Sequence, residues 1–123
     1  MPSAIVVDDS RAIRMIVGRT LRGLGYEVRE AGNGAEALTV LSSGPPPDLV
    51  MADWNMPVMD GLELLRRIRA SAEFSGVPVI MVTTEAEVDQ MTAALAAGAN
   101  EYIMKPFTAE ILAEKLQIAG LVG

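Results

Sequence analysis

Five polar side chains stand where short apolar runs of this chain end. Asp8 and Asp9 follow the run AIVV, Asp53 follows LVMA, Thr83 follows VIMV, and Lys105 follows YIM. An isolated carboxylate is costly to bury, so each acid must be hydrated, paired or bound to a metal. The chain contains no cysteine and no histidine. Any metal site must therefore use oxygen ligands.

Three carboxylates at neighbouring strand ends would repel one another. Two unit charges about 4 Å apart interact by roughly 4 kcal/mol at an effective dielectric constant of 20. Mg²⁺ is the leading candidate for a compensating ion, because Mg²⁺ binds one or two carboxylates, keeps water ligands and binds phosphate. Mn²⁺ is an alternative. The Asp8–Asp9 pair is suited to holding it.

The same residues predict phosphoryl transfer to an aspartate. Carboxylates serve as nucleophiles that form aspartyl phosphates. Asp53 is the single acid at its strand end, and we predict that it attacks phosphorus. Lys105 and the metal would neutralise phosphoryl oxygens, and the Thr83 hydroxyl would donate to the new anion.

Five strand–helix units are expected to position these residues. The predicted strands cover 3–8, 26–31, 48–53, 77–83 and 101–104, and the predicted helices cover 10–24, 33–42, 60–71, 86–97 and 108–119. Three helix starts have the spacing of a capping box: Asn33 with Glu36, Asp60 with Glu63, and Thr84 with Glu87. Gly25 and Gly98 stand where helices should end.

The alternation of strands and helices predicts a single α/β domain over residues 1–123. The continuous runs AIVV, LVMA and VIMV are typical of strands buried on both faces. We therefore expect a doubly wound, five-stranded parallel sheet with right-handed crossovers and helices on both faces. In such a sheet functional residues gather at the carboxyl ends of the strands.

The first predicted helix has two distinct faces. One face is apolar and should cover the sheet: Ile13, Ile16, Val17, Leu21 and Leu24. The opposite face is expected to be solvated, with a docking surface for an acidic or mixed partner surface as the alternative: Arg11, Arg14, Met15, Gly18 and Arg22.

Composition excludes several classes of function. The net charge of −6 argues against sequence-independent nucleic-acid binding, which needs an excess of Lys and Arg. The first apolar run, residues 4–7, is too short to span a bilayer and no basic segment precedes it. We therefore expect neither a signal peptide nor membrane insertion, and a cytoplasmic location.

Four stretches, IVVDDS, LVMADWNMPVMDG, VIMVTTE and YIMKPF, resemble in order and spacing the receiver domain of two-component response regulators. Within this family, DWNMPVMDG and KPFT are most similar to the single-domain chemotaxis regulators. The resemblance spans essentially the whole chain. It implies a flavodoxin-like fold with strand order 2-1-3-4-5.

The resemblance also assigns roles at the predicted site. Asp53 would be the phosphoacceptor, and Asp9, Asp53 and the backbone carbonyl of Asn55 would hold Mg²⁺, with Asp8 acting through the metal's waters. Trp54, next to Asp53, should lie partly exposed beside the metal.

Thr83 and Tyr102 would form the switch, and Lys105 would take part in the phosphoryl chemistry. Thr83 would move toward the phosphoryl group, Tyr102 would change between outward and inward positions, and Lys105, before a cis peptide bond to Pro106, would pair with the phosphoryl oxygens.

Three neighbours of the site would set the lifetime of the phosphoryl group. The resemblance implies that Asn55 and Glu85 favour a short-lived phosphoryl group. Many family members have Ala or Gly where this chain has Thr84, so the larger side chain is expected to slow transfer or hydrolysis.

The implied partners are proteins of a phosphorelay. The phosphodonor would be a histidine kinase or phosphotransfer protein, since this chain has no histidine. The output surface would comprise the fourth helix, fifth strand and fifth helix and would include Met91, Glu101, Tyr102, Met104 and Lys115. Its partner could be a flagellar motor switch protein, and a phosphatase could act on the phosphorylated form. The chain itself would not be an enzyme, apart from self-phosphotransfer and self-dephosphorylation.

Three alternatives are less well supported by the residues. Haloacid-dehalogenase phosphatases carry a D-x-D motif after the first strand, where this chain has Asp8–Asp9. A flavodoxin-like cofactor site is disfavoured because the acids would repel a flavin phosphate. A receiver module of a longer regulator is the third. A receiver of another phosphorelay, in contrast, fits the same residues and stays open as an alternative. We expect a stand-alone regulator, because no effector domain follows Gly123 and the acidic pair typical of transcriptional regulators is here Asn100–Glu101.

Overall fold

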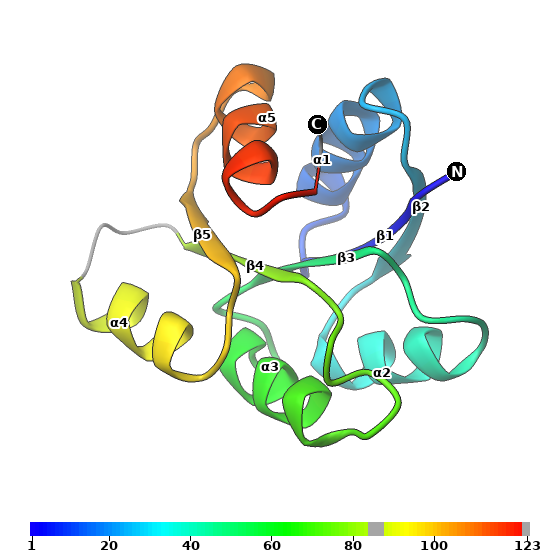
Figure 1. Cartoon of the computed structure of the whole chain (residues 1–123), viewed down its shortest axis with the longest axis vertical. Coiled ribbons are helices and arrows are strands. Elements are labelled where there is room, and N and C mark those ends of the chain that lie inside the picture. Colours follow the sequence, from blue (N-terminus) through cyan, green and yellow to red (C-terminus); the bar gives the residue numbers. More distant parts are fainter. Residues whose placement is uncertain (84–87, 122–123) are drawn as a thin grey trace.

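Strands and helices alternate along the chain in the computed structural model, which describes residues 1–83 and 88–121 (Figure 1). The strands are β1 (Ser3–Val7), β2 (Glu27–Ala31), β3 (Leu49–Asp53), β4 (Val79–Thr83) and β5 (Glu101–Met104). The helices are α1 (Arg11–Gly23), α2 (Gly34–Ser42), α3 (Gly61–Ala70), α4 (Val88–Ala96) and α5 (Ala109–Ile118). The predicted capping box of Thr84 and Glu87 lies outside the described residues.

The strands form one parallel sheet in the order β2-β1-β3-β4-β5. The predicted fold class and strand order are therefore confirmed. Figure 1 shows α1 and α5 on one face of the sheet and α2, α3 and α4 on the other. Every residue of β3 and β4 is buried, as their continuous apolar runs predicted.

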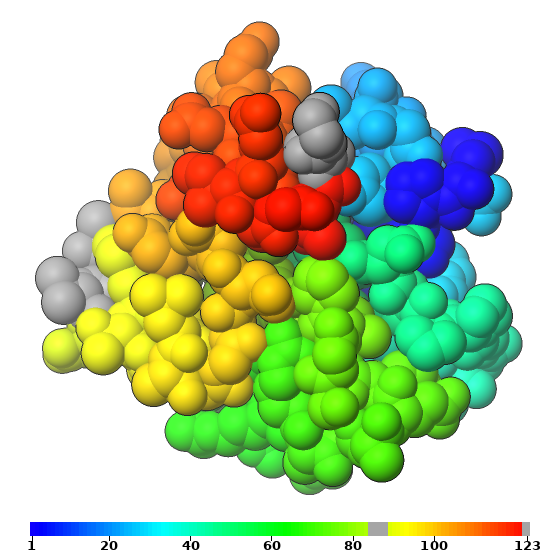
Figure 2. All heavy atoms as spheres, in the orientation of Figure 1, coloured from blue at the N-terminus to red at the C-terminus, as the bar shows by residue number. Residues whose placement is uncertain are grey.

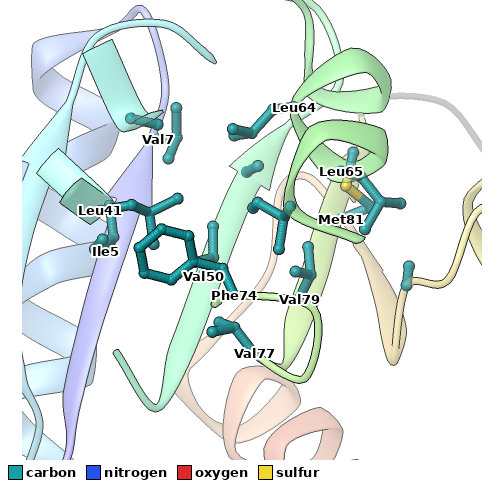
Figure 3. Packing of buried hydrophobic residues seen from close by; sticks show 14 of the residues in the cluster. Ile5, Val7, Leu41, Val50, Leu64, Leu65, Phe74, Val77, Val79 and Met81 are labelled. Atoms are coloured by element: carbon teal, nitrogen blue, oxygen red, sulfur yellow. The ribbon is translucent and has the colours of Figure 1, made fainter. Parts of the chain in front are cut away.

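Alternate strand residues point to opposite layers of the core. Ile5 and Val7 of β1 belong to the cluster under α2 and α3, whereas Ala4 and Val6 belong to the cluster under α1 and α5. In Figure 3, Leu64 and Leu65 of α3 lie over the strands in the first cluster. Phe74 from the α3–β4 connection belongs to the same cluster and lies nearer to Leu41 and Val50 in that view. Burial of one such large apolar side chain contributes about 1.5–3 kcal/mol, and both faces of the central strands are covered in this way.

Side-chain caps start four of the helices. The predicted caps Asn33 and Asp60 accept hydrogen bonds from the backbone N–H groups three residues later, at 2.8 and 2.9 Å. Ser10 and Thr108 cap α1 and α5 in the same way. Gly25 and Gly98 adopt positive φ angles of 96° and 104° after α1 and α4, the left-handed conformation that glycine tolerates at helix ends.

The prediction for the faces of α1 was partly wrong. Ile16, placed on the buried face, is 60% exposed, and Leu24 is 37% exposed. Gly18, placed on the solvated face, is buried, and a Cβ atom there would lie 3.5 Å from Val28 of β2. Arg14 is also largely covered, with 18% of its side chain exposed. The difference arises because α1 packs partly against the edge strand β2. The face of α1 that is buried is therefore rotated from the face that hydrophobicity alone predicts.

No helix in the part of the chain that the structure describes is long and apolar enough to cross a membrane.

Candidate functional site

The acids predicted to bind a metal converge at the carboxyl ends of β1 and β3, which are neighbours in the sheet. Asp53 is the last residue of β3, and Asp8 and Asp9 directly follow β1. One carboxylate oxygen from each of the three residues lies within 4.8 Å of the other two. Asp8 and Asp53 are buried, whereas Asp9 is exposed. These oxygen atoms form a donor set suited to Mg²⁺ or Mn²⁺ and could hold such an ion.

Lys105 approaches the acids from the end of β5. Its Nζ lies 2.7 Å from Asp8 Oδ2 and 3.5 Å from Asp53 Oδ2. Its backbone N–H donates to the carbonyl oxygen of Thr83 at 2.7 Å, which holds this end of β5 against β4. The Lys105–Pro106 peptide bond is cis, as the family resemblance implied. The ammonium therefore lies between two of the carboxylates.

Burial and charge act in opposite directions on the ionisation of this cluster. Burial raises the pKa of Asp53, the Lys105 ammonium opposes that rise, and the Asp8 carboxylate adds to it. Burial alone would lower the pKa of Lys105, but its hydrogen bond to Asp8 and the charges of Asp53 and Asp8 outweigh burial and raise it. One cation faces three acids, so a divalent cation would relieve the repulsion that remains.

Thr83 ends β4 beside the acids. Val82, the residue before Thr83 in β4, is paired with Asp53 of β3 in the sheet register. Thr83 is fully buried, and among the described residues its Oγ1 is the buried side-chain polar atom without a hydrogen-bond partner. Leaving a buried hydroxyl unsatisfied costs about 1–3 kcal/mol, so the group is poised to gain an acceptor. The predictions for Thr84 and Glu85 fall on residues outside the described ranges.

The loop after β3 carries Trp54 and Asn55. The backbone N–H of Trp54 donates to the Val82 carbonyl at 3.0 Å, and the Trp54 carbonyl accepts from the Gly61 backbone N–H at 3.0 Å. Trp54 is half-buried, as predicted, and Asn55 is exposed. Gly61 must be glycine, because a Cβ atom there would collide with the Asp53 carbonyl oxygen. The loop is therefore held tightly where it leaves the acidic cluster.

The five residues predicted for the output surface also lie together. Lys115 Nζ is 4.6 Å from the centroid of the half-buried Tyr102 ring and 3.5 Å from Glu101 Oε1. Met91 and Met104 line a groove of about 380 Å³ with Tyr102 and Lys115. In Figure 2, the segment from α4 (yellow) to α5 (orange to red) forms one side of the molecule.

Two contacts at the site were missed by the sequence analysis. The Ser10 backbone N–H donates to Asp8 Oδ1 at 2.8 Å. Arg14 donates from Nη1 to the Asp8 carbonyl oxygen at 2.5 Å. The Ser10 contact could not be predicted from residue type, because its donor is a backbone N–H, which every residue except proline has. The Arg14 contact could not be predicted either, because the distance between Arg14 and Asp8 depends on the path of α1. The Asp-x-Ser spacing was the one available signal, because Asp commonly accepts from the N–H group two residues later.

Known proteins share this sequence pattern over nearly the whole chain. The family model for the response regulator receiver domain matches residues 4–117. The chemotaxis protein CheY1 of Helicobacter pylori is 45% identical over 115 residues, which cover 93% of each chain. A CheY homolog of Campylobacter jejuni is 46% identical over 114 residues, covering 92% of this chain and 88% of that protein.

Solved structures agree with the sequence relatives. The structure of the chemotaxis protein CheY4 of Vibrio cholerae superposes with a TM-score of 0.89 at 38% identity and covers 95% of this chain and 97% of its own. A CheY-like receiver domain protein from Methanospirillum hungatei gives a TM-score of 0.85 at 33% identity, with 95% and 91% covered. This chain belongs to the response regulator receiver domain family and is of the CheY-like chemotaxis type.

Proposed function

We propose that this chain is a Mg²⁺-dependent phosphorylation switch in a chemotaxis phosphorelay, with one receiver domain over residues 1–123 and Asp53 as its phosphoacceptor. The observation that carries the proposal is the meeting of three carboxylates within 4.8 Å with the Lys105 ammonium at the strand ends. Similarity to chemotaxis proteins of the CheY type supports the pathway. The cytoplasmic location stays a prediction.

In the proposed transfer, an Asp53 carboxylate oxygen attacks the phosphorus of a phosphohistidine on a kinase or phosphotransfer protein. The new P–O bond forms as the P–N bond breaks, and the imidazole leaves with the bonding electrons and takes a proton from water. Lys105 Nζ, 3.5 Å from Asp53 Oδ2, pairs with a phosphoryl oxygen. Mg²⁺ held by Asp9, Asp53 and the Asn55 carbonyl would neutralise further phosphoryl charge. Asp8 would contribute through the metal's waters.

The output of the proposed switch is conformational. The phosphoryl group adds roughly −1.5 to −2 charge and three acceptor oxygens. The buried Thr83 hydroxyl has an acceptor to gain from this group, and its movement would allow Tyr102 to turn inward. The groove that Tyr102 lines with Met91, Met104 and Lys115 would then change shape for its partner, such as a flagellar motor switch protein.

The proposed chemistry is limited to the chain's own aspartate. In self-dephosphorylation, water attacks phosphorus, the bond between phosphorus and Asp53 breaks, and inorganic phosphate leaves. A phosphatase partner would accelerate this step. The chain would therefore signal by binding and not by turning over an external substrate.

Labelling by a small phosphodonor tests the proposal. The protein is incubated with acetyl phosphate in Mg²⁺ or in EDTA, and its mass is measured before and after hydroxylamine, which cleaves acyl phosphates. We expect one phosphoryl group in Mg²⁺, none in EDTA, none in Asp53→Asn, and loss of the label in hydroxylamine. Asp48→Asn, at the opposite end of β3, is the matched control and should be labelled like wild type. Labelling of Asp53→Asn, or a label that survives hydroxylamine, would contradict the proposal.

A further inference from the structure

Arg14 connects three elements beside the acidic cluster. It lies near the start of α1, and its Nη1 donates to the carbonyl oxygen of Asp8 at 2.5 Å. Its Nε donates to Glu30 Oε1 on β2 at 3.0 Å. Only 18% of the Arg14 side chain is exposed. Two nitrogen atoms of the same guanidinium therefore bind a backbone carbonyl at the site and a carboxylate on the edge strand at the same time.

The carbonyl that Arg14 binds belongs to the peptide between Asp8 and Asp9. A peptide unit is planar, so holding its oxygen fixes the direction in which the chain enters Asp9. Asp9 is exposed, and its carboxylate lacks the surrounding core that holds Asp8 and Asp53. Its orientation depends mainly on this backbone.

The other polar groups of Asp8 are also occupied. Its N–H donates to the Ala31 carbonyl at 3.1 Å, Oδ1 accepts from Ser10 N–H at 2.8 Å, and Oδ2 accepts from Lys105 Nζ at 2.7 Å. The bond from Arg14 completes this set. Asp8 is thus held from β2, α1 and β5, and Arg14 supplies the one contact that fixes the peptide leading to Asp9.

We propose that Arg14 is a positioning residue for the metal site, which keeps the Asp9 carboxylate directed toward the ion shared with Asp53, and that Glu30 holds Arg14 in place. The inference rests on the proposed function, because it assumes that the three acids bind Mg²⁺. Charge alone would act in the opposite direction, since removal of a nearby cation favours binding of another cation. The sign of the change in Mg²⁺ affinity therefore separates positioning from simple electrostatics.

The decisive measurement is a Mg²⁺ titration of wild type, Arg14→Gln and Arg19→Gln, followed by Trp54 fluorescence and by calorimetry. Arg19 is exposed on the same helix, so its variant controls for loss of one positive charge. Loss of a group that orients metal ligands typically weakens metal binding about 10–100-fold. We expect the dissociation constant to rise at least about tenfold in Arg14→Gln and to stay close to the wild-type value in Arg19→Gln.

Two milder variants keep the test independent of overall folding. Arg14→Lys retains the charge and one donor for the Asp8 carbonyl, so it should restore part of the affinity lost in Arg14→Gln. Glu30→Gln retains an acceptor for Arg14 and should weaken Mg²⁺ binding less than Arg14→Gln. In EDTA, the amide NMR signals of Asp9 and Ser10 should shift in Arg14→Gln and not in Arg19→Gln, a readout that needs no metal.

The outcomes distinguish this inference from the proposed function. Wild-type binding of Mg²⁺ together with equal or tighter binding by folded Arg14→Gln would overturn the role of Arg14 alone. If Arg14→Gln does not fold, Arg14→Lys and Glu30→Gln with wild-type affinity would overturn it equally. Absence of Mg²⁺ binding by wild type would overturn the proposed metal site and this inference with it.

Discussion

At Asp53, the proposed chemistry and the stability of the fold oppose each other. Burial raises the pKa of Asp53 above its value in the unfolded chain. The folded state therefore binds this proton more tightly than the unfolded state, so the stability contributed by Asp53 falls as pH rises from the unfolded to the folded pKa. Without Mg²⁺ at pH 7, we expect Asp53→Asn to have a higher free energy of unfolding than wild type. This advantage should disappear at pH values below the pKa that Asp53 has in the unfolded chain, where the carboxyl is protonated in both states.

Urea unfolding in EDTA measures this effect across pH. Asp48→Asn is the control, because Asp48 lies exposed at the other end of β3. If the free energy of unfolding rose as much in Asp48→Asn as in Asp53→Asn, the stabilisation would come from the change in net charge and not from the site. A less stable Asp53→Asn at pH 7 would show that the pKa of Asp53 is not raised in the fold.

Thr83 gives a second residue-scale prediction. Its buried Oγ1 has no partner among the described residues, whereas its methyl group packs in a fully buried position. Thr83→Val preserves the shape and removes the unsatisfied hydroxyl, so the unphosphorylated protein should become more stable by about 1 kcal/mol. The variant should still be labelled at Asp53 but should lose most of the change in partner affinity on phosphorylation. Equal stability losses in Thr83→Val and Thr83→Ala would mean that the hydroxyl is satisfied in solution.

Among the elements, α3 is fastened to the opposite end of the sheet by Arg69. Its guanidinium donates to the carbonyl oxygens of Gly98 at 2.9 Å, Val77 at 2.6 Å and Ser75 at 3.1 Å, and to Asn100 Oδ1 at 3.0 Å. These contacts join the end of α3 to the loops that lead into β4 and β5. We expect Arg69→Met to lower the free energy of unfolding by about 3 kcal/mol, because several carbonyl groups lose a charged donor.

Arg67→Met is the matched control for this element. Arg67 lies on the same helix and forms an exposed pair with Glu63 at 3.2 Å, and such pairs contribute about 0.3–0.5 kcal/mol. Chemical unfolding of both variants, combined with a Mg²⁺ titration, checks the prediction. Comparable losses in the two variants, or a changed Mg²⁺ affinity in Arg69→Met, would contradict a purely structural role at the far end of the sheet.

For the whole molecule, the sequence predicted those features that depend on local pattern. Continuous apolar runs predicted buried central strands, and the polar residues at their ends predicted the site, because parallel strands bring their carboxyl ends to one edge. The exposure of Ile16 and the burial of Gly18 could not be predicted, because they depend on how α1 lies over β2. The Arg14–Glu30 contact likewise appears only once β2 is known to lie next to β1. Strand order itself came from family resemblance and not from pattern.

The final prediction concerns coupling between the site and global stability. An ion bound between β1 and β3 would join neighbouring strands that contribute to both core layers, so unfolding should release it in a single cooperative transition. If Mg²⁺ binds only the folded state, a Mg²⁺ concentration about ten times the dissociation constant raises the free energy of unfolding by about 1.4 kcal/mol. For a domain of this length, the melting temperature should rise by about 5–6 °C. Calorimetry of wild type and Asp9→Ala in Mg²⁺ and in EDTA measures the shift, with Ca²⁺-free buffers and constant ionic strength. Asp9→Ala should lose most of the Mg²⁺-dependent rise in melting temperature. An equal rise in wild type and Asp9→Ala would mean that the stabilising ion binds at another site.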